Sequence, residues 1–152
     1  MSHLICLASD TPLEAMSDPH KRSDACITID TKTGTVTAPP EDYWDVWPMR
    51  FPPRARSEKQ YFAEVQWPRS APGRTEILTD YLRRHLERAE AVELWNLWDG
   101  DDVELVRVHR ETFSLAALTP EKLSAFCEKD VVHPALLAGT EVWHQHCLCI
   151  IR

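Results

Sequence analysis

Glycine is scarce in this sequence, whose 152 residues include four glycines against eleven prolines. Because proline fixes φ whereas glycine frees the backbone, this ratio predicts connections that are stiff rather than flexible. Long apolar runs are also missing. The apolar stretch near the start, Leu4 to Ala8, lacks a basic flank and is too short for a signal peptide or a membrane span. We therefore expect a cytoplasmic protein with no membrane partner.

Cysteine pairs of the CxxC type and zinc-finger spacings are both absent. The five cysteines form an odd set: Cys6, Cys26, Cys127, Cys147 and Cys149. An odd number without paired spacing fits a reducing compartment, with buried or free thiols, better than a disulfide framework. For Cys127, with His133 six residues later, a structural thiol is the favoured interpretation.

The common catalytic signatures are missing as well. The sequence contains no GxSxG, no glycine-rich phosphate loop and no HExxH. Hydrolases, nucleotide-binding enzymes and metalloproteases of the usual kinds therefore find no support. This favours a protein that is not an enzyme, without deciding the matter.

Positive charge is in deficit, with a formal net charge of −7. The charge is uneven: residues 1–49 carry −5, residues 50–75 carry +4 and residues 76–130 carry −6. Because nucleic-acid binding depends largely on neutralising phosphates, an acidic body argues against a nucleic-acid partner. The basic segment 50–75 is still compatible with a more limited binding role within an otherwise acidic protein.

The apolar fraction of 43% and the charged fraction of 27% are typical of a soluble globular protein, and the length fits a single domain, 1–152. Residues 75–89 show the clearest helical periodicity, with Thr75 as the expected N-cap and His85 at the edge of the stripe. The apolar stripe comprises Ile77, Leu78, Tyr81, Leu82, Leu86 and Ala89. Thr119, followed by Pro120, predicts a short second helix through Phe126.

Alternating patterns predict the strands. A hairpin over 25–38 turns around Gly34, and an antiparallel pair, 91–98 and 103–114, is joined at an Asp-Gly turn. Further strands are expected at 4–9, 61–67 and 140–151, and in the 61–67 strand Tyr61, Ala63, Val65 and Trp67 are expected on one face. The predicted fold class is α+β: a mainly antiparallel sheet with one principal helix packed on a face and a short second helix.

Two segments, 78–86 (LTDYLRRHL) and 92–102 (VELWNLWDGDD), resemble a group of small uncharacterised bacterial α+β proteins. Further shared features are an N-terminal strand ending near Leu7 and a hydrophobic final strand. Members of that group carry a Cys-Gly-Cys segment before the helix, whereas this chain has QWPRSAPGRT there. The resemblance supports the topology and implies no activity.

Residues 43–56 read YWDVWPMRFPPRAR, an unusual concentration of aromatic, proline and arginine residues. Because the prolines remove backbone donors, a central strand or a helix is not expected, and a stiff loop is. Trp44 and Trp47 either fold over the sheet edge as a lid on the core or belong to a protein-binding surface. Tryptophan and arginine are enriched in such surfaces. The predicted contact residues are Trp44, Trp47, Arg50, Phe51 and Arg54.

Carboxylates cluster in DGDDVE, residues 99–104. Calcium-loop spacing is missing, and aspartates beside a glycine are what a solvated turn requires. We assign Asp99, Asp101 and Asp102 to long-range attraction of a basic partner protein.

The C-terminal WHQHCLC holds the sharpest chemical pattern. On a strand, His144 and His146 share one face, from which both imidazoles can reach one metal ion such as zinc. Third-ligand candidates are His109, His133 and Glu141. The alternative is a closing strand with half-exposed imidazoles and small core thiols.

Two functions follow from these patterns. The first is a non-catalytic protein-binding domain, of the kind found in bacterial immunity or antitoxin-like inhibitors, that needs no cofactor and masks a basic partner. The second is a small metal-binding protein or metal-dependent enzyme that uses the His-x-His pair.

Overall fold

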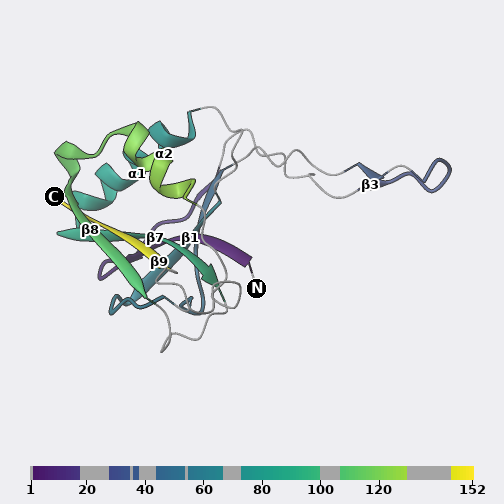
Figure 1. Cartoon of the computed structure of the whole chain (residues 1–152). Helices are drawn as coiled ribbons and strands as arrows, with labels where there is room; N and C mark the ends of the chain where they lie inside the picture. Colours follow the sequence, from purple (N-terminus) through teal and green to yellow (C-terminus); the bar gives the residue numbers. More distant parts are fainter. Residues whose placement is uncertain are drawn as a thin grey trace.

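The computed structural model describes residues 2–17, 28–34, 36–37, 44–53, 55–66, 73–99, 107–129 and 145–152. In this part of the chain, one sheet of seven strands has both α-helices on one face (Figure 1). The strand order is β2-β5-β6-β1-β7-β9-β8, and every neighbouring pair is antiparallel except β8 and β9. The predicted α+β class with a mainly antiparallel sheet is confirmed.

The strands of this sheet are β1 (Ser2–Ser9), β2 (Met16–Ser17), β5 (Asp45–Pro48), β6 (Tyr61–Gln66), β7 (Ala91–Asp99), β8 (Val108–Ser114) and β9 (Gln145–Ile151). The helices are α1 (Arg74–Leu86), the 3-10 turn η1 (Leu115–Ala117) and α2 (Pro120–Cys127).

Alternation along the strands sends side chains into two apolar clusters, one on each face of the sheet. Ile5 and Leu7 of β1 belong to the main core beneath the helices, whereas Leu4 and Cys6 belong to a second cluster on the opposite face. Strands that are apolar on both faces must be covered on both faces. The helices cover one face, and residues between β5 and β6 cover the other.

Helix α1 places its apolar stripe in the main core, as predicted, with Ile77 half-buried. Two predictions about it are wrong. The N-cap is Gly73, with a φ of 69°, rather than Thr75, because the helix begins at Arg74, two residues before the start that a Thr75 cap implies. His85 is 2% exposed rather than a boundary residue, since its ring bonds to Ser9 across the core.

Helix α2 begins as the sequence predicts. The side chain of Thr119 accepts a hydrogen bond from the backbone N–H of Lys122 at 3.2 Å, and Pro120 occupies the first turn. Leu123, Phe126 and Cys127 face the core.

The predicted antiparallel pairing of 91–98 with 103–114 is wrong. Strand β9 lies between β7 and β8, pairing antiparallel with the first and parallel with the second. The residues of the Asp-Gly turn lie outside the described part, apart from Asp99. The sequence QHCLCII explains the placement, because a strand that is apolar on both faces is stabilised in the interior of a sheet.

The hairpin predicted at 25–38 is confirmed in its described residues. Strands β3 (Thr28–Ile29) and β4 (Val36–Thr37) pair antiparallel. Gly34, with a φ of 69°, donates its backbone N–H to the carbonyl of Asp30 at 2.8 Å. Figure 1 draws this hairpin away from the sheet and helices.

The sequence predicted a stiff loop over the whole of 43–56, and this prediction is wrong for part of it. Residues Asp45–Pro48 form β5, which pairs with β2 on one side and β6 on the other. Pro48 is tolerated because it ends the strand, where a missing N–H removes little of the ladder. On β6, Ala63 and Val65 are buried whereas Tyr61 is 41% exposed, and Trp67 lies outside the described residues.

No helix within the described residues has the length and apolar character needed to cross a membrane.

Candidate functional site

The most exposed large apolar side chains of the described chain include two that the sequence singles out. Trp47 is 49% exposed and Phe51 is 73% exposed, while Trp44 is half-buried. The guanidinium of Arg50 lies 5.6 Å from the centre of the Phe51 ring. We call Trp47, Arg50 and Phe51 the aromatic surface. Trp47 and Trp44 therefore do not form a closed lid over the core.

The residues after Trp47 are held firmly although they carry exposed side chains. The backbone N–H of Met49 donates to the carbonyl of Phe62 at 2.8 Å, and Pro53 is buried. Met49 and Ala55 pack against the second cluster, which contains Leu4, Cys6, Ala8, Phe62, Trp95, Leu97 and Cys147. The described residues between β5 and β6, which we call the covering segment, thus lie over the second face of the sheet and present Arg50 and Phe51 outward.

A cleft adjoins this surface. It has a volume of about 250 Å³ and is formed by the start of the segment, by β6 and by residues after β1: Pro12, Leu13, Pro48, Met49, Arg50, Pro52, Gln60, Tyr61 and Phe62. Its lining is mostly apolar or proline, with Arg50 as its charged residue. The arrangement suits an apolar side chain from a binding partner.

Most of the predicted acidic residues lie outside the described part of the chain. Asp99 ends β7, where its backbone pairs with Ser2 of β1, while Asp101 and Asp102 are not described. Arg54 also lies outside. The predicted attraction of a basic partner through these acids stays a prediction.

The described histidine of the His-x-His pair, His146, lies beside one of its proposed co-ligands. In the β8–β9 pairing His109 is opposite His146, and their ring centres are 5.8 Å apart. Burial, followed by the charge of Lys129, lowers the pKa of His146, and its Nδ1 atom has no hydrogen-bond partner within the described residues. A neutral imidazole of this kind is the form that binds metal.

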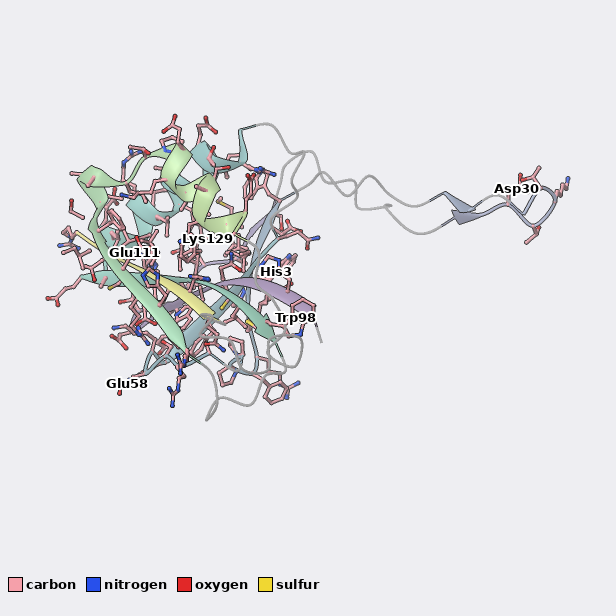
Figure 2. The ribbon with its side chains drawn as sticks, viewed as in Figure 1. His3, Asp30, Glu58, Trp98, Glu111 and Lys129 are labelled. Carbon is pink, nitrogen blue, oxygen red and sulfur yellow. The ribbon has the colours of Figure 1, made fainter. Side chains whose placement is uncertain are left out.

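The surroundings of the pair are polar. His109 Nδ1 lies 3.4 Å from a carboxylate oxygen of Glu111, which is also 3.6 Å from Lys129 Nζ. Figure 2 labels Glu111, which lies on β8, and Lys129, which lies two residues after the end of α2. Across the described ranges, no three or more His, Cys, Asp or Glu side chains gather in a group able to hold a metal ion. His144, His133 and Glu141 lie outside those ranges.

A second polar centre, on the face away from the helices, was missed by sequence reasoning. Glu93 on β7 is only 7% exposed. Its carboxylate accepts hydrogen bonds from Ser57 at 2.6 Å, from the Trp95 indole at 2.8 Å and from Arg110 at 3.0 Å. The Arg110 guanidinium also lies 4.8 Å from the Trp95 ring centre. We call these four residues the Glu93 network.

The Glu93 network joins two strands, β7 and β8, to the segment between β5 and β6. The side chain of Arg110 donates to the backbone carbonyl of Arg56, and Ser57 comes from the same segment. Figure 2 shows Glu58, the next residue, on the side of the sheet away from the helices. A glutamate within the apolar run VELWNL was the available signal, because buried charges need partners. Two of those partners, Arg110 and Ser57, are 17 and 36 positions away in sequence, so the sequence did not reveal them.

The described cysteines behave as packing residues. Burial, followed by the charge of Glu93, raises the pKa of the Cys147 thiol to about 12, and burial also raises the pKa values of Cys127 and Cys149. Cys127 is 2% exposed and belongs to the main core. Raised pKa values leave these thiols protonated at neutral pH and so weakly nucleophilic.

No protein-family model, curated protein or solved structure matches this chain. The resemblance drawn from residues 78–86 and 92–102 therefore stays a prediction.

Proposed function

We propose that this chain is a non-catalytic protein-binding domain, and that the aromatic surface is the centre of its contact with another protein. The observation that carries the proposal is the exposure of Trp47 and Phe51 beside an apolar cleft. Tryptophan and arginine supply much of the binding energy in protein interfaces, especially around a pocket that excludes water. A net charge of −7 favours a basic partner, as in immunity or antitoxin-like inhibition.

The way the surface is held adds to this support. Met49 and Pro53 fix the chain on either side of Phe51, by a backbone hydrogen bond and by burial. A segment that is ordered before binding loses little conformational entropy when a partner arrives. Exposed aromatic residues on such a segment thus retain more of their contact energy as affinity.

Trp47→Ala is expected to weaken the complex by about 2 kcal/mol or more, as interface hot spots do, which is roughly thirtyfold in Kd. The free energy of unfolding of the isolated chain should fall by much less, because half of the side chain is already in water. The measurement pairs a denaturant melt with calorimetric titration of a partner identified by affinity capture.

Ile151→Ala is the matched control. Ile151 is 40% exposed but lies at the end of β9, four strands away from β5, which carries Trp47. It should leave Kd unchanged. A large loss of stability in free Trp47→Ala protein, with no separate loss of affinity, would mean that Trp47 is architectural.

We propose metal binding at His146 as the second candidate function, because the β8–β9 register brings His109 beside it. In this proposal the imidazoles of His109 and His146, together with that of His144, would ligate a zinc ion. The zinc ion would be catalytic if its fourth coordination position is open to water, and structural if a fourth protein ligand fills that position.

If this second function holds, purified protein should contain close to one zinc ion per chain by elemental analysis. The His144→Ala, His146→Ala double variant should lose the metal and its thermal stabilisation by added zinc. His20→Ala, at a histidine outside the proposed set, should keep both. Wild-type protein that contains no metal and shows no thermal shift with zinc would exclude this function.

A further inference from the structure

Strand β8 forms one edge of the seven-stranded sheet (Figure 1). It pairs with β9 on one side, and among the described residues no strand pairs with its other side. Its seven residues stay in register with β9 without a bulge, and none of them is proline. Bulges, prolines and very short strands are common means of preventing an edge from pairing with another chain. The opposite edge, β2, has only two residues, so β8 is the edge that can accept a further strand.

The hydrogen bonds to β9 show which backbone groups of β8 point outward. The backbone N–H of Gln145 donates to the carbonyl of Arg107 at 3.1 Å, so Arg107 faces β9. Along a strand, the N–H and C=O of one residue point to the same side, and this side alternates from residue to residue. The residues whose backbone groups point away from β9 are therefore Val108, Arg110, Thr112 and Ser114.

Charged side chains can also block an edge, but those of β8 do not lie across it. The Arg110 guanidinium donates to the carboxylate of Glu93 on β7 at 3.0 Å, so it lies along the sheet and its charge is compensated. His109 and Glu111 are on the other face, toward α2, where Glu111 lies 3.6 Å from Lys129 Nζ. There His109 Nδ1 is 3.4 Å from the Glu111 carboxylate, which places a donor and an acceptor side by side along the strand.

A second copy of β8 is complementary to this pattern. In an antiparallel pair with a twofold axis at Arg110, His109 of each copy lies opposite Glu111 of the other. Because Arg110 points outward, these are the pairs without backbone hydrogen bonds, whose Cα atoms are only about 4.5 Å apart. Each imidazole can then donate to the carboxylate opposite it. An axis at Glu111 would instead oppose two carboxylates, which is destabilising.

We propose that two copies of this chain form a twofold dimer through β8, in which His109 of each copy lies opposite Glu111 of the other. Backbone hydrogen bonds along the paired edges give the affinity, and the His109–Glu111 pairs fix the register. Strand β5, which carries Trp47, lies five strands away from β8. The dimer therefore leaves the aromatic surface of both copies outside the junction, and it goes beyond either proposed function.

Sedimentation velocity of the full-length protein over a dilution series tests for the dimer. EDTA is present throughout, so that zinc cannot join two copies through His109. The wild-type chain should sediment as a dimer at high concentration and dissociate on dilution.

Thr112→Pro should raise the Kd of the dimer at least about tenfold, because it removes one outward N–H from each copy. Proline is tolerated at an edge position whose N–H points away from the sheet, and circular dichroism checks that the monomer stays folded. Thr112→Ala is the matched control at this exposed position. It shortens the side chain but keeps the N–H, and should change Kd less than about threefold.

A charge exchange tests the register without changing the backbone. In Glu111→Lys protein the new lysine faces His109 of the other copy, and in His109→Glu protein the new carboxylate faces Glu111. Each variant alone should dimerise at least about tenfold more weakly than wild type. In an equimolar mixture, both cross-strand pairs of the heterodimer join opposite charges. Native mass spectrometry should therefore show the heterodimer in excess over both homodimers.

The proposal is wrong if the wild-type chain sediments as a monomer at every concentration. It is also wrong if Thr112→Pro and Thr112→Ala dimerise as tightly as each other, because the junction would then not use the outward groups of β8. A mixture of the two charge variants that forms no more heterodimer than homodimer would exclude the register centred on Arg110.

Discussion

Leu82→Ala is expected to lower the free energy of unfolding by about 2–5 kcal/mol, the range for truncating a buried leucine. Leu82 is fully buried at the centre of the α1 stripe, within a core that also includes Leu123 of α2 and Leu94 of β7. Because helices and sheet meet there, neighbouring side chains cannot all collapse into the space left by the deleted methyl groups. Urea melts of the two proteins measure the difference.

Leu82→Met serves as the control, because it keeps the volume nearly constant and should cost less than about 1.5 kcal/mol. A loss of less than about 0.5 kcal/mol for Leu82→Ala, as at surface positions, would show that the stripe does not form the core.

Local signals in the sequence were sufficient for several elements. The periodicity around Leu82 predicted α1, and the Thr119-Pro120 pair predicted the start of α2. Gly34 marked the β3–β4 turn, where its φ of 69° is reached at little cost. In each case the interactions that form the element lie within a few residues of one another in the chain. The local sequence pattern is therefore enough to predict the element.

Strand pairing was not predictable in the same way. The Asp-Gly pair after Trp98 indicated a reversal, but it does not say which strand becomes the neighbour. In the structure β8, α2 and β9 form a strand–helix–strand unit, and β9 takes the place beside β7. Parallel pairing through a helical crossover depends on packing over the whole sheet.

The candidate sites show the same division. Trp47, Arg50 and Phe51 were identified from residue type, whereas their exposure depends on which face of β5 Trp47 occupies and on how Pro53 is buried. Glu93 was missed, and His85 was wrongly placed at the edge of the stripe, because each has a partner far away in the chain, Ser57 for Glu93 and Ser9 for His85, at separations of 36 and 76 residues. A buried polar residue is recognised by its partners, and only the fold supplies them.

Glu93→Ala is expected to lower the free energy of unfolding by about 3 kcal/mol. The substitution removes the acceptor for three donors at once: the Ser57 hydroxyl, the Trp95 indole and the Arg110 guanidinium. Trp95 is fully buried, so its indole N–H would lose its partner in an apolar setting. Arg110 can turn toward water, since its side chain is 45% exposed, which keeps the loss near the lower end of the range for a broken buried ion pair.

The matched control is Glu64→Ala, which removes the same side chain from an exposed position on β6 and should change stability by less than about 0.5 kcal/mol. Denaturant melts give the two values, and hydrogen exchange of the Trp95 indole N–H reports on the network itself. Exchange should speed up in Glu93→Ala and stay slow in Glu64→Ala. If both variants lose the same small amount of stability and the indole stays protected in both, the carboxylate does not hold the covering segment to the sheet. In that case the apolar contacts of Met49 and Ala55 with the second cluster are what keep the aromatic surface in place.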